Sequence, residues 1–387
     1  MSAVRRVIVM IDLEWVLVHH HQIFAGIQRY SRECGTWECS INPHADTLLA
    51  DHRREGLPDG IVARATPRLA ELARKTGVPV VNVWLNTPTR GLPSVLHDPE
   101  ASGRMAAEHL LARGFRSFGF IGYSRNRGSR LQSAGFRETI EAAGYRCSEN
   151  LASPRYAATG AHWQRFQARL GRWIDSWSRP IGIFAAHDRL ARYLAEACRQ
   201  RALKVPHDVA LVGAFNEKVV CLDGVPALSS IDFGFEQVGY QAAALLDKLM
   251  NGAPPPEGPI RIAPNMLAAR QSSDSYVVDH PQLARALRFI AEQAHTPIGV
   301  AEVAAHVATT RRTLARLFQR ELKQTVHEAI TRLRVERAKR RLMEPHAMLK
   351  TVAAECGFHD AIHLCKVFQR VEGVSPSDYR DDRGWRK

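Results

Sequence analysis

The sequence has no apolar run approaching the roughly 18 residues that a membrane-spanning helix requires. Its seven cysteines form no CxxC pair and are odd in number, which argues against a disulfide framework or a zinc ribbon and suits a reducing compartment. No phosphate-binding glycine loop, Ser-His-Asp order or paired metal ligands stand out. The chain is therefore not expected to be an enzyme or to hold a cofactor.

The amino-terminal segment also lacks a long apolar run. In MSAVRRVIVMID only five apolar residues follow the two arginines before Asp12, too few for a signal peptide core, so a first strand and a cytoplasmic location are expected. Three consecutive histidines, His19 to His21, cannot all point at one ion from a helix or strand. We therefore predict no metal site there.

What the sequence does contain is length and a regular rhythm. A chain of 387 residues that is 45% hydrophobic can form two or three domains. Apolar strand candidates alternate with amphipathic helices up to about residue 270: VRRVIVMI, GIVA, VPVVNVW, FGFIGY, IGIFAA, DVALVGAF and IRIAPNML. The helices predicted between them include 100–113, 133–143, 190–201 and 235–250. This rhythm indicates parallel α/β sheets, and its length favours two lobes with a ligand site at the strand ends.

The last hundred residues follow a different pattern, with helical spacing and two successive helix-turn-helix units. In the second unit an apolar stripe of Val352, Ala353 and Cys356 precedes Gly357, where a residue with positive φ would end the helix. Asp360 can then cap a second helix. Its predicted inner face is Leu364, Val367, Phe368 and Val371, and its outer face includes His363 and Lys366.

The first unit repeats this arrangement between residues 300 and 322. Val303, Ala304 and Val307 form the stripe, and Thr309 or Thr310 opens the second helix. Leu314, Leu317 and Phe318 are predicted inside it, with Arg311, Arg312, Arg316 and Arg320 outside. A long basic helix over 327–343 could hold the two units at a fixed separation.

Charge is concentrated in the same region. Residues 280–387 contain 20 lysines and arginines against 12 aspartates and glutamates, a net charge of +8, whereas the whole chain carries +14. Single arginines on outer helix faces are commonly solvated surface, but this density fits neutralisation of DNA phosphates. Membrane binding would predict a long basic amphipathic helix or an apolar anchor, whereas the helices here have apolar faces sized for a domain core.

The carboxy-terminal motifs resemble the DNA-binding domain of the AraC-type family of bacterial transcription factors, through 310–322 and the GF...F...GVSP..YR ending. The resemblance implies that the second helix of each unit enters successive major-groove segments. It assigns Arg311, Arg312 and Arg316 to one segment and Asp360, His363 and Lys366 to the next. This sequence departs from the family pattern at Ala308, where glycine is usual, and at Leu364, where an aromatic residue is common.

The preceding region is similar to the sugar-binding domains of LacI/GalR-type repressors and periplasmic binding proteins. Four stretches carry this resemblance, beginning HDPEASGRM, RLQSAGF, IFAAHDR and PALSSID. The family's sugar contacts fall here on Arg130, His187 with Asp188, and Asn216. His187 replaces the usual asparagine and Phe215 stands where aspartate is common, so a more apolar wall or a different sugar is expected.

The residue chemistry fits a sugar, which presents hydroxyls that both donate and accept hydrogen bonds. Arg130 and Asp188 could each hold adjacent hydroxyls, and Trp84 could stack on a pyranose face. Alternatives stay open, because Asp188 can equally cap a helix and Trp84 can belong to the core or the hinge. Asp12, after the first strand, can likewise contact the sugar or have only a structural role.

The predicted fold is a two-lobed, periplasmic-binding-protein-like α/β domain (residues 1–271), a linker (272–280) and an all-α domain with two helix-turn-helix motifs (281–387). This combination resembles bacterial xylose operon regulators. It implies a homodimeric, sugar-responsive activator that binds promoter DNA and xylose or another pentose, with RNA polymerase as a further partner. The alternative is a sugar-binding protein or an enzyme of sugar metabolism without a role on DNA.

Overall fold

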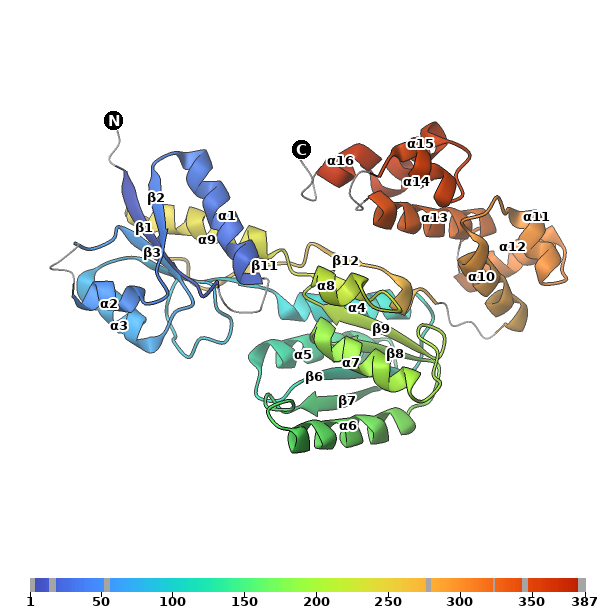
Figure 1. The fold of residues 1–387 in the computed structure, drawn as a ribbon, viewed down its shortest axis with the longest axis horizontal. Helices are drawn as coiled ribbons and strands as arrows, with labels where there is room; N and C mark the ends of the chain where they lie inside the picture. Colours follow the sequence, from blue (N-terminus) through green and yellow to red (C-terminus); the bar gives the residue numbers. More distant parts are fainter. Residues whose placement is uncertain are drawn as a thin grey trace. The chain divides into compact units, whose positions relative to one another are not determined.

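The protein is described by a computed structural model that covers residues 4–13, 19–51, 56–275, 280–322, 324–342 and 347–381, with only the backbone of residues 336, 340 and 381. It divides into an α/β unit, Met1–Leu111 with Arg116–Ala268, and a helical unit, Ala112–Phe115 with Ala269–Lys387 (Figure 1). The predicted class, a two-lobed α/β domain followed by helix-turn-helix motifs, is confirmed. Residues 276–279 of the predicted linker lie outside the described residues, and the predicted domain limits stay a prediction.

The first lobe of the α/β unit is built on a parallel sheet of order β2-β1-β3-β4. Its strands are β1 (Arg5–Met10), β2 (Trp37–Ile41), β3 (Gly60–Ala63) and β4 (Val80–Asn82). Helices α1 (His19–Cys34), α2 (Ala45–Ala50), α3 (Pro67–Thr76) and α9 (Phe235–Met250) flank it. All four residues of β3 are buried, as expected for a strand covered on both faces.

The second lobe has a six-stranded sheet of order β12-β10-β9-β8-β6-β7, parallel except for β12. The strands are β6 (Phe118–Tyr123), β7 (Cys147–Ala152), β8 (Ile181–Ala185), β9 (Val209–Ala214), β10 (Ser229–Asp232) and β12 (Met266–Ala268). Its helices are α4 (Pro99–Leu111), α5 (Arg127–Ala142), α6 (Gly160–Asp175), α7 (Asp188–Arg199) and α8 (Lys218–Leu222). A separate two-stranded sheet pairs β5 (Val95–His97) with β11 (Ile260–Ile262).

The sequence prediction differs from this structure at several strands. The segment IRIAPNML was predicted as one strand, but Pro264, which lacks an N–H donor, lies between β11 and β12, and these belong to different sheets. The strands β2, β5, β7 and β10 were not predicted. Helix α5 begins at Arg127, not at residue 133.

Helix α9 follows the second lobe in sequence but packs on α1 of the first. The two helices approach closely because glycines face each other's backbone: a Cβ on Gly26 would lie 1.9 Å from Glu236 O, and one on Gly239 would lie 1.9 Å from Ile23 O. The pair α4 and α5 in the second lobe uses Gly103 in the same way, 2.2 Å from Gln132 O. Backbone contact thus fixes one helix pair in each lobe.

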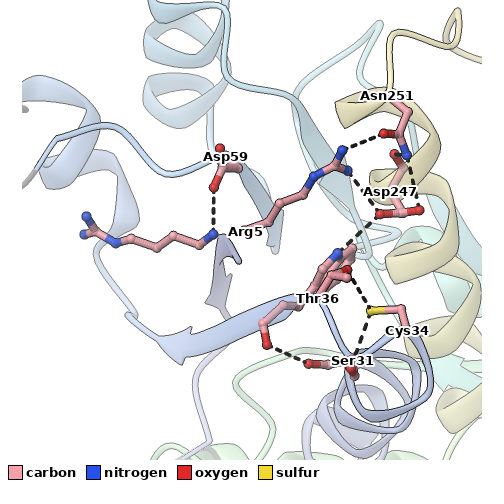
Figure 2. Close-up of polar contacts among 9 residues, drawn as sticks. Arg5, Ser31, Cys34, Thr36, Asp59, Asp247 and Asn251 are labelled. Atoms are coloured by element: carbon pink, nitrogen blue, oxygen red, sulfur yellow. Dashed lines mark hydrogen bonds and ion pairs between the residues drawn. The ribbon is translucent and has the colours of Figure 1, made fainter. Parts of the chain in front are cut away.

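A polar cluster ties the end of α9 to the start of the chain. Arg5, on β1, donates from Nη1 to Asp247 Oδ1 at 3.2 Å and from Nη2 to Asn251 Oδ1 at 2.5 Å (Figure 2). The Trp37 indole donates to the same Asp247 oxygen at 3.3 Å. These contacts hold the last turn of α9 in the first lobe.

The helical unit contains a 3₁₀ turn, η1 (Gln271–Ser273), and seven α-helices among its described residues. They are α10 (Pro281–Gln293), α11 (Val300–His306), α12 (Arg311–Leu322), α13 (Val326–Leu342), α14 (Leu349–Glu355), α15 (Ala361–Glu372) and α16 (Pro376–Asp381). Two apolar cores form, and α13 contributes to both, with Ala329 and Ile330 in the first and Val335, Ala338 and Leu342 in the second. The predicted long helix is confirmed.

Candidate functional site

Six aromatic rings gather where the strands of the α/β unit end. We call them the histidine-phenylalanine cluster: His19, His97, His187, Phe215, Phe233 and Phe235. His187, after β8, stacks on Phe215, after β9, with ring centroids 4.7 Å apart. Residues His19 and Phe235 begin α1 and α9, and their centroids are 4.9 Å apart. The cluster lies at the carboxyl ends of the strands, where open α/β sheets bind ligands.

The three histidines of the cluster are held neutral. Burial lowers the pKa of His19 to about 2, with the neighbouring His20 adding to the effect. Burial also lowers the pKa of His97 to about 4, helped by Arg261, and that of His187 to about 4, helped by Arg189. At neutral pH each ring therefore has one donor and one acceptor nitrogen, which matches the two-way hydrogen bonding of a hydroxyl group.

Asp188 follows His187 of this cluster and is fully buried at the start of α7. Its carboxylate accepts from Ser230 Oγ at 2.6 Å and from the backbone N–H of Glu217 at 2.8 Å. Burial raises its pKa to about 7. Both carboxylate oxygens thus already accept a hydrogen bond, one from β10 and one from the segment that follows β9.

Glu217 is the carboxylate that Asp188 positions. It is 7% exposed, and its Oε1 lies 3.6 Å from His187 Nε2 while its Oε2 lies 3.5 Å from Arg189 Nε. Burial raises its pKa. Within the described part of the chain no hydrogen bond reaches Oε1. A buried acceptor without a donor is costly, and a ligand hydroxyl would satisfy it.

Asn216 neighbours this group. It has a φ of 51°, and its Nδ2 donates to Asp232 Oδ2 at 3.3 Å, which turns the amide toward the end of β10. Its backbone N–H donates to Ser230 Oγ at 3.0 Å, the hydroxyl that also binds Asp188. The structure thus brings His187, Asp188 and Asn216 together, as the sequence suggested.

The other three predicted sugar contacts are placed differently. Trp84 is half-buried after β4, with the Arg64 guanidinium 4.7 Å from its ring centroid. Asp12 has an exposed side chain, and its backbone oxygen lies 2.6 Å from His20 Nδ1. Arg130 is exposed on the first turn of α5, and among the contacts of the described residues none joins its side chain to the cluster.

In the helical unit α12 has the predicted two faces. Thr310 accepts a hydrogen bond from the Thr313 backbone N–H at 3.1 Å and so caps the helix. Leu314, Leu317 and Phe318 are buried, while Arg311, Arg312 and Arg316 are exposed. The preceding turn contains Ala308 at a φ of 53°, the left-handed conformation in which glycine is usual.

Helix α15 repeats this geometry. Asp360 caps it, accepting from the His363 backbone N–H at 2.7 Å. Leu364, Val367 and Phe368 are buried as predicted, and His363 and Lys366 are exposed. The prediction for Val371 was wrong: it is 42% exposed because it lies beyond the second core near the end of the helix.

Helix α13 connects the two helix-turn-helix units. Arg334, one of the basic residues of this helix, is half-buried and donates to Ala294 O at 2.8 Å, Thr296 O at 2.9 Å and Ile298 O at 3.0 Å. A Cβ on Gly357, in the second turn, would lie 2.4 Å from the same Ala294 O. This contact fixes the second turn against the loop that precedes α11.

Comparisons with known proteins agree with this arrangement. Residues 107–273 match the periplasmic binding protein-like domain family, and residues 303–382 match a helix-turn-helix domain family. The xylose operon regulatory protein of Haemophilus influenzae is 28% identical over 382 residues, covering 94% of this chain and 95% of the relative. Its namesake from Escherichia coli K12 is 26% identical, covering 94% of each.

Among solved structures, that of a xylose-binding transcription activator superposes with a TM-score of 0.63 at 23% identity and covers 98% of this chain and 99% of its own. The sensor fold and the DNA-binding fold thus occur together along nearly the whole chain. The chain is a two-domain transcription regulator.

Sequence reasoning missed several residues of the regulator's candidate site. Glu217 could have been suspected from its place directly after Asn216, whereas His97 and Phe233 gave no signal because their strands were not predicted. Among the helices that the structure describes, none is long and apolar enough to cross a bilayer. The described residues also form no group of three or more side chains suited to a metal ion.

Proposed function

We propose that the regulator activates pentose-utilisation genes and that xylose is its effector. The observation that supports this most directly is Glu217, a buried carboxylate with an unsatisfied oxygen beside the neutral His187 at the strand ends. Relatives that match nearly the full chain are named for the xylose operon. Residues 1–271 would sense the sugar, 272–280 would link, and 281–387 would bind DNA.

Each predicted sugar contact has a definite role in this proposal. His187, Asn216 and Glu217 would bind hydroxyls, and Trp84 would lie against the apolar face of the ring. Asp12 and Arg130 would reach the sugar from the two lobes as these close. Asp188 would act indirectly, through the backbone of Glu217.

On DNA, α12 and α15 would enter successive major-groove segments. Arg311, Arg312 and Arg316 would serve the first segment, and His363 and Lys366 the second. Asp360 would act mainly by capping α15, since its carboxylate accepts from that helix's backbone. The regulator would work as a cytoplasmic homodimer that contacts RNA polymerase, with no catalytic activity.

Control would be a population shift. Xylose binds the closed arrangement of the lobes more tightly than the open one, and closure repositions the readers of the dimer on adjacent half-sites. A sugar with equal affinity for both arrangements could not switch the protein.

The test combines sugar and DNA titrations of the full chain. Xylose should bind the wild-type protein and tighten its binding to a promoter fragment upstream of pentose genes. Glu217→Gln should weaken xylose binding at least about ten-fold, because a charge-assisted hydrogen bond is lost. The matched control is Glu196→Gln on the exposed face of α7, which should bind xylose normally. Equal DNA affinity with and without every pentose would refute sugar control.

A further inference from the structure

The two reading helices can be superimposed residue by residue because their caps and cores repeat at the same spacing. Thr310 and Asp360 both accept a hydrogen bond from the backbone N–H three residues later. The buried triplet Leu314, Leu317, Phe318 has its counterpart in Leu364, Val367, Phe368. Arg316 and Lys366 therefore occupy equivalent positions, both exposed.

At one equivalent position the two helices differ sharply in chemistry. Position 312, in the first turn of α12, is an exposed arginine, whereas its counterpart in α15 is Ile362, 67% exposed. Ile362 lies beside His363 and one turn before Lys366, on the polar and basic side of the helix. An isoleucine left in water on that side loses the free energy that its burial would provide. Contact with an apolar group of the bound DNA would bury this side chain within the basic surface of the helix.

The major groove contains such a partner. Thymine is the base that presents an apolar C5-methyl group there, whereas guanine presents the N7 and O6 acceptors that an arginine binds. We propose that Ile362 reads a thymine methyl group in the segment bound by α15, while Arg312 reads a guanine at the equivalent place in the segment bound by α12. This inference rests on the proposed DNA binding and names the base preference of each reader.

The test removes the methyl group from the DNA instead of from the protein. In a promoter fragment that the protein binds, each thymine is replaced in turn by deoxyuridine, and the Kd is measured for wild type and for Ile362→Ala. One replacement should weaken wild-type binding about four-fold, the value of one buried methyl group. The same replacement should leave the affinity of Ile362→Ala unchanged.

Val371→Ala is the matched control. Val371 is also β-branched and exposed on α15, but it lies nine residues from Ile362 and therefore on the opposite side of the helix. This variant should respond to deoxyuridine as the wild type does. Circular dichroism should show that both variants retain their helices, as expected for substitutions of exposed residues.

A parallel scan tests the arginine. Replacing guanines by 7-deazaguanine removes the N7 acceptor, and one replacement should weaken wild-type binding but not that of Arg312→Ala. If Ile362→Ala keeps the wild-type loss at every deoxyuridine, or Arg312→Ala keeps it at every 7-deazaguanine, the assignment is overturned while DNA binding itself stands. Failure of the wild-type protein to bind any promoter fragment would instead refute the proposed function.

Discussion

Asp188 and Glu217 are neighbouring carboxylates that differ in their hydrogen bonds: both oxygens of Asp188 accept one, whereas Glu217 Oε1 accepts none from the described residues. Asp188→Ala should lower the free energy of unfolding by about 1–3 kcal/mol, since it leaves the Glu217 backbone N–H and the Ser230 hydroxyl without their acceptor. Urea denaturation would measure this loss. Asp175→Ala is the control: its carboxylate is 65% exposed in an ion pair with Arg201, and the change should cost little.

His187 should make stability depend on pH. Burial lowers its pKa from 6.5 to about 4, so between these values the unfolded chain binds a proton here that the folded chain does not. The stability contributed by the neutral imidazole is complete above pH 6.5 and is lost as the pH falls toward 4.

His187→Gln should therefore flatten the rise of unfolding free energy with pH over this interval, by up to about 1.4 kcal/mol per pH unit. Denaturant titrations at several pH values would show it. The raised pKa of Asp188 gives the opposite slope, but it is present in both proteins and so cancels in the comparison. Parallel pH profiles for the two proteins would contradict the assignment.

For single residues, the sequence predicted which side chains follow the strands but not which hydrogen bonds each of them makes. His187, Asp188 and Asn216 were correctly placed together because carboxyl ends of parallel strands meet at one edge. The hydrogen bond to Asp188 Oδ1 comes from Ser230, which follows Asp188 by 42 residues and lies on a strand that was not predicted. No spacing rule links such distant residues.

Among the elements, the α1–α9 pair depends on glycine. Gly239→Ala would place a Cβ against the backbone of Ile23, which cannot yield as a flexible side chain can. We expect a loss of about 1–3 kcal/mol of stability, measured by thermal unfolding. Gly160→Ala, at the start of α6 with open space around it, should be neutral or slightly stabilising.

The first helix-turn-helix contains a correctable strain. Ala308 adopts a φ of 53°, which costs an alanine roughly 1 kcal/mol relative to glycine. Ala308→Gly should therefore stabilise the helical unit by about that amount in urea denaturation. Ala315→Gly, at an exposed position inside α12, should have the opposite sign, because glycine weakens a helix interior. Destabilisation by both would show that the turn is not strained.

Helices were predicted better than strands, for a physical reason. The 3.6-residue stripe of α12 or α15 repeats over three turns, whereas β5 and β10 have three and four residues and little room for a pattern. Strand β7, CSENLA, has three polar residues among six, so nothing in its composition suggests a sheet.

For the whole molecule, the uneven charge predicts how DNA binding responds to salt. Removing one cation that neutralises a phosphate should make the slope of log K against log salt concentration shallower by about one. Arg316→Ala and Lys366→Ala should each do so while leaving xylose affinity unchanged. Lys75→Ala, an exposed lysine paired with Glu71 on α3, should leave the slope as it is. Loss of both DNA and sugar binding in a variant would indicate misfolding.

The order of domains was predictable because each has its own periodicity and charge, but the internal bracing of the helical unit was not. In the sequence Arg334 cannot be told apart from the exposed Arg332, and only the fold brings the carbonyls of the α10–α11 loop to it.

Helix α13 has a consequence of its own. This one helix of seventeen residues contributes side chains to both apolar cores. Unwinding of its middle would therefore destabilise both helix-turn-helix units at once. Neither helix-turn-helix unit is expected to fold as an isolated fragment without its part of α13. A chimeric protein that carries one unit must therefore include that part of the helix.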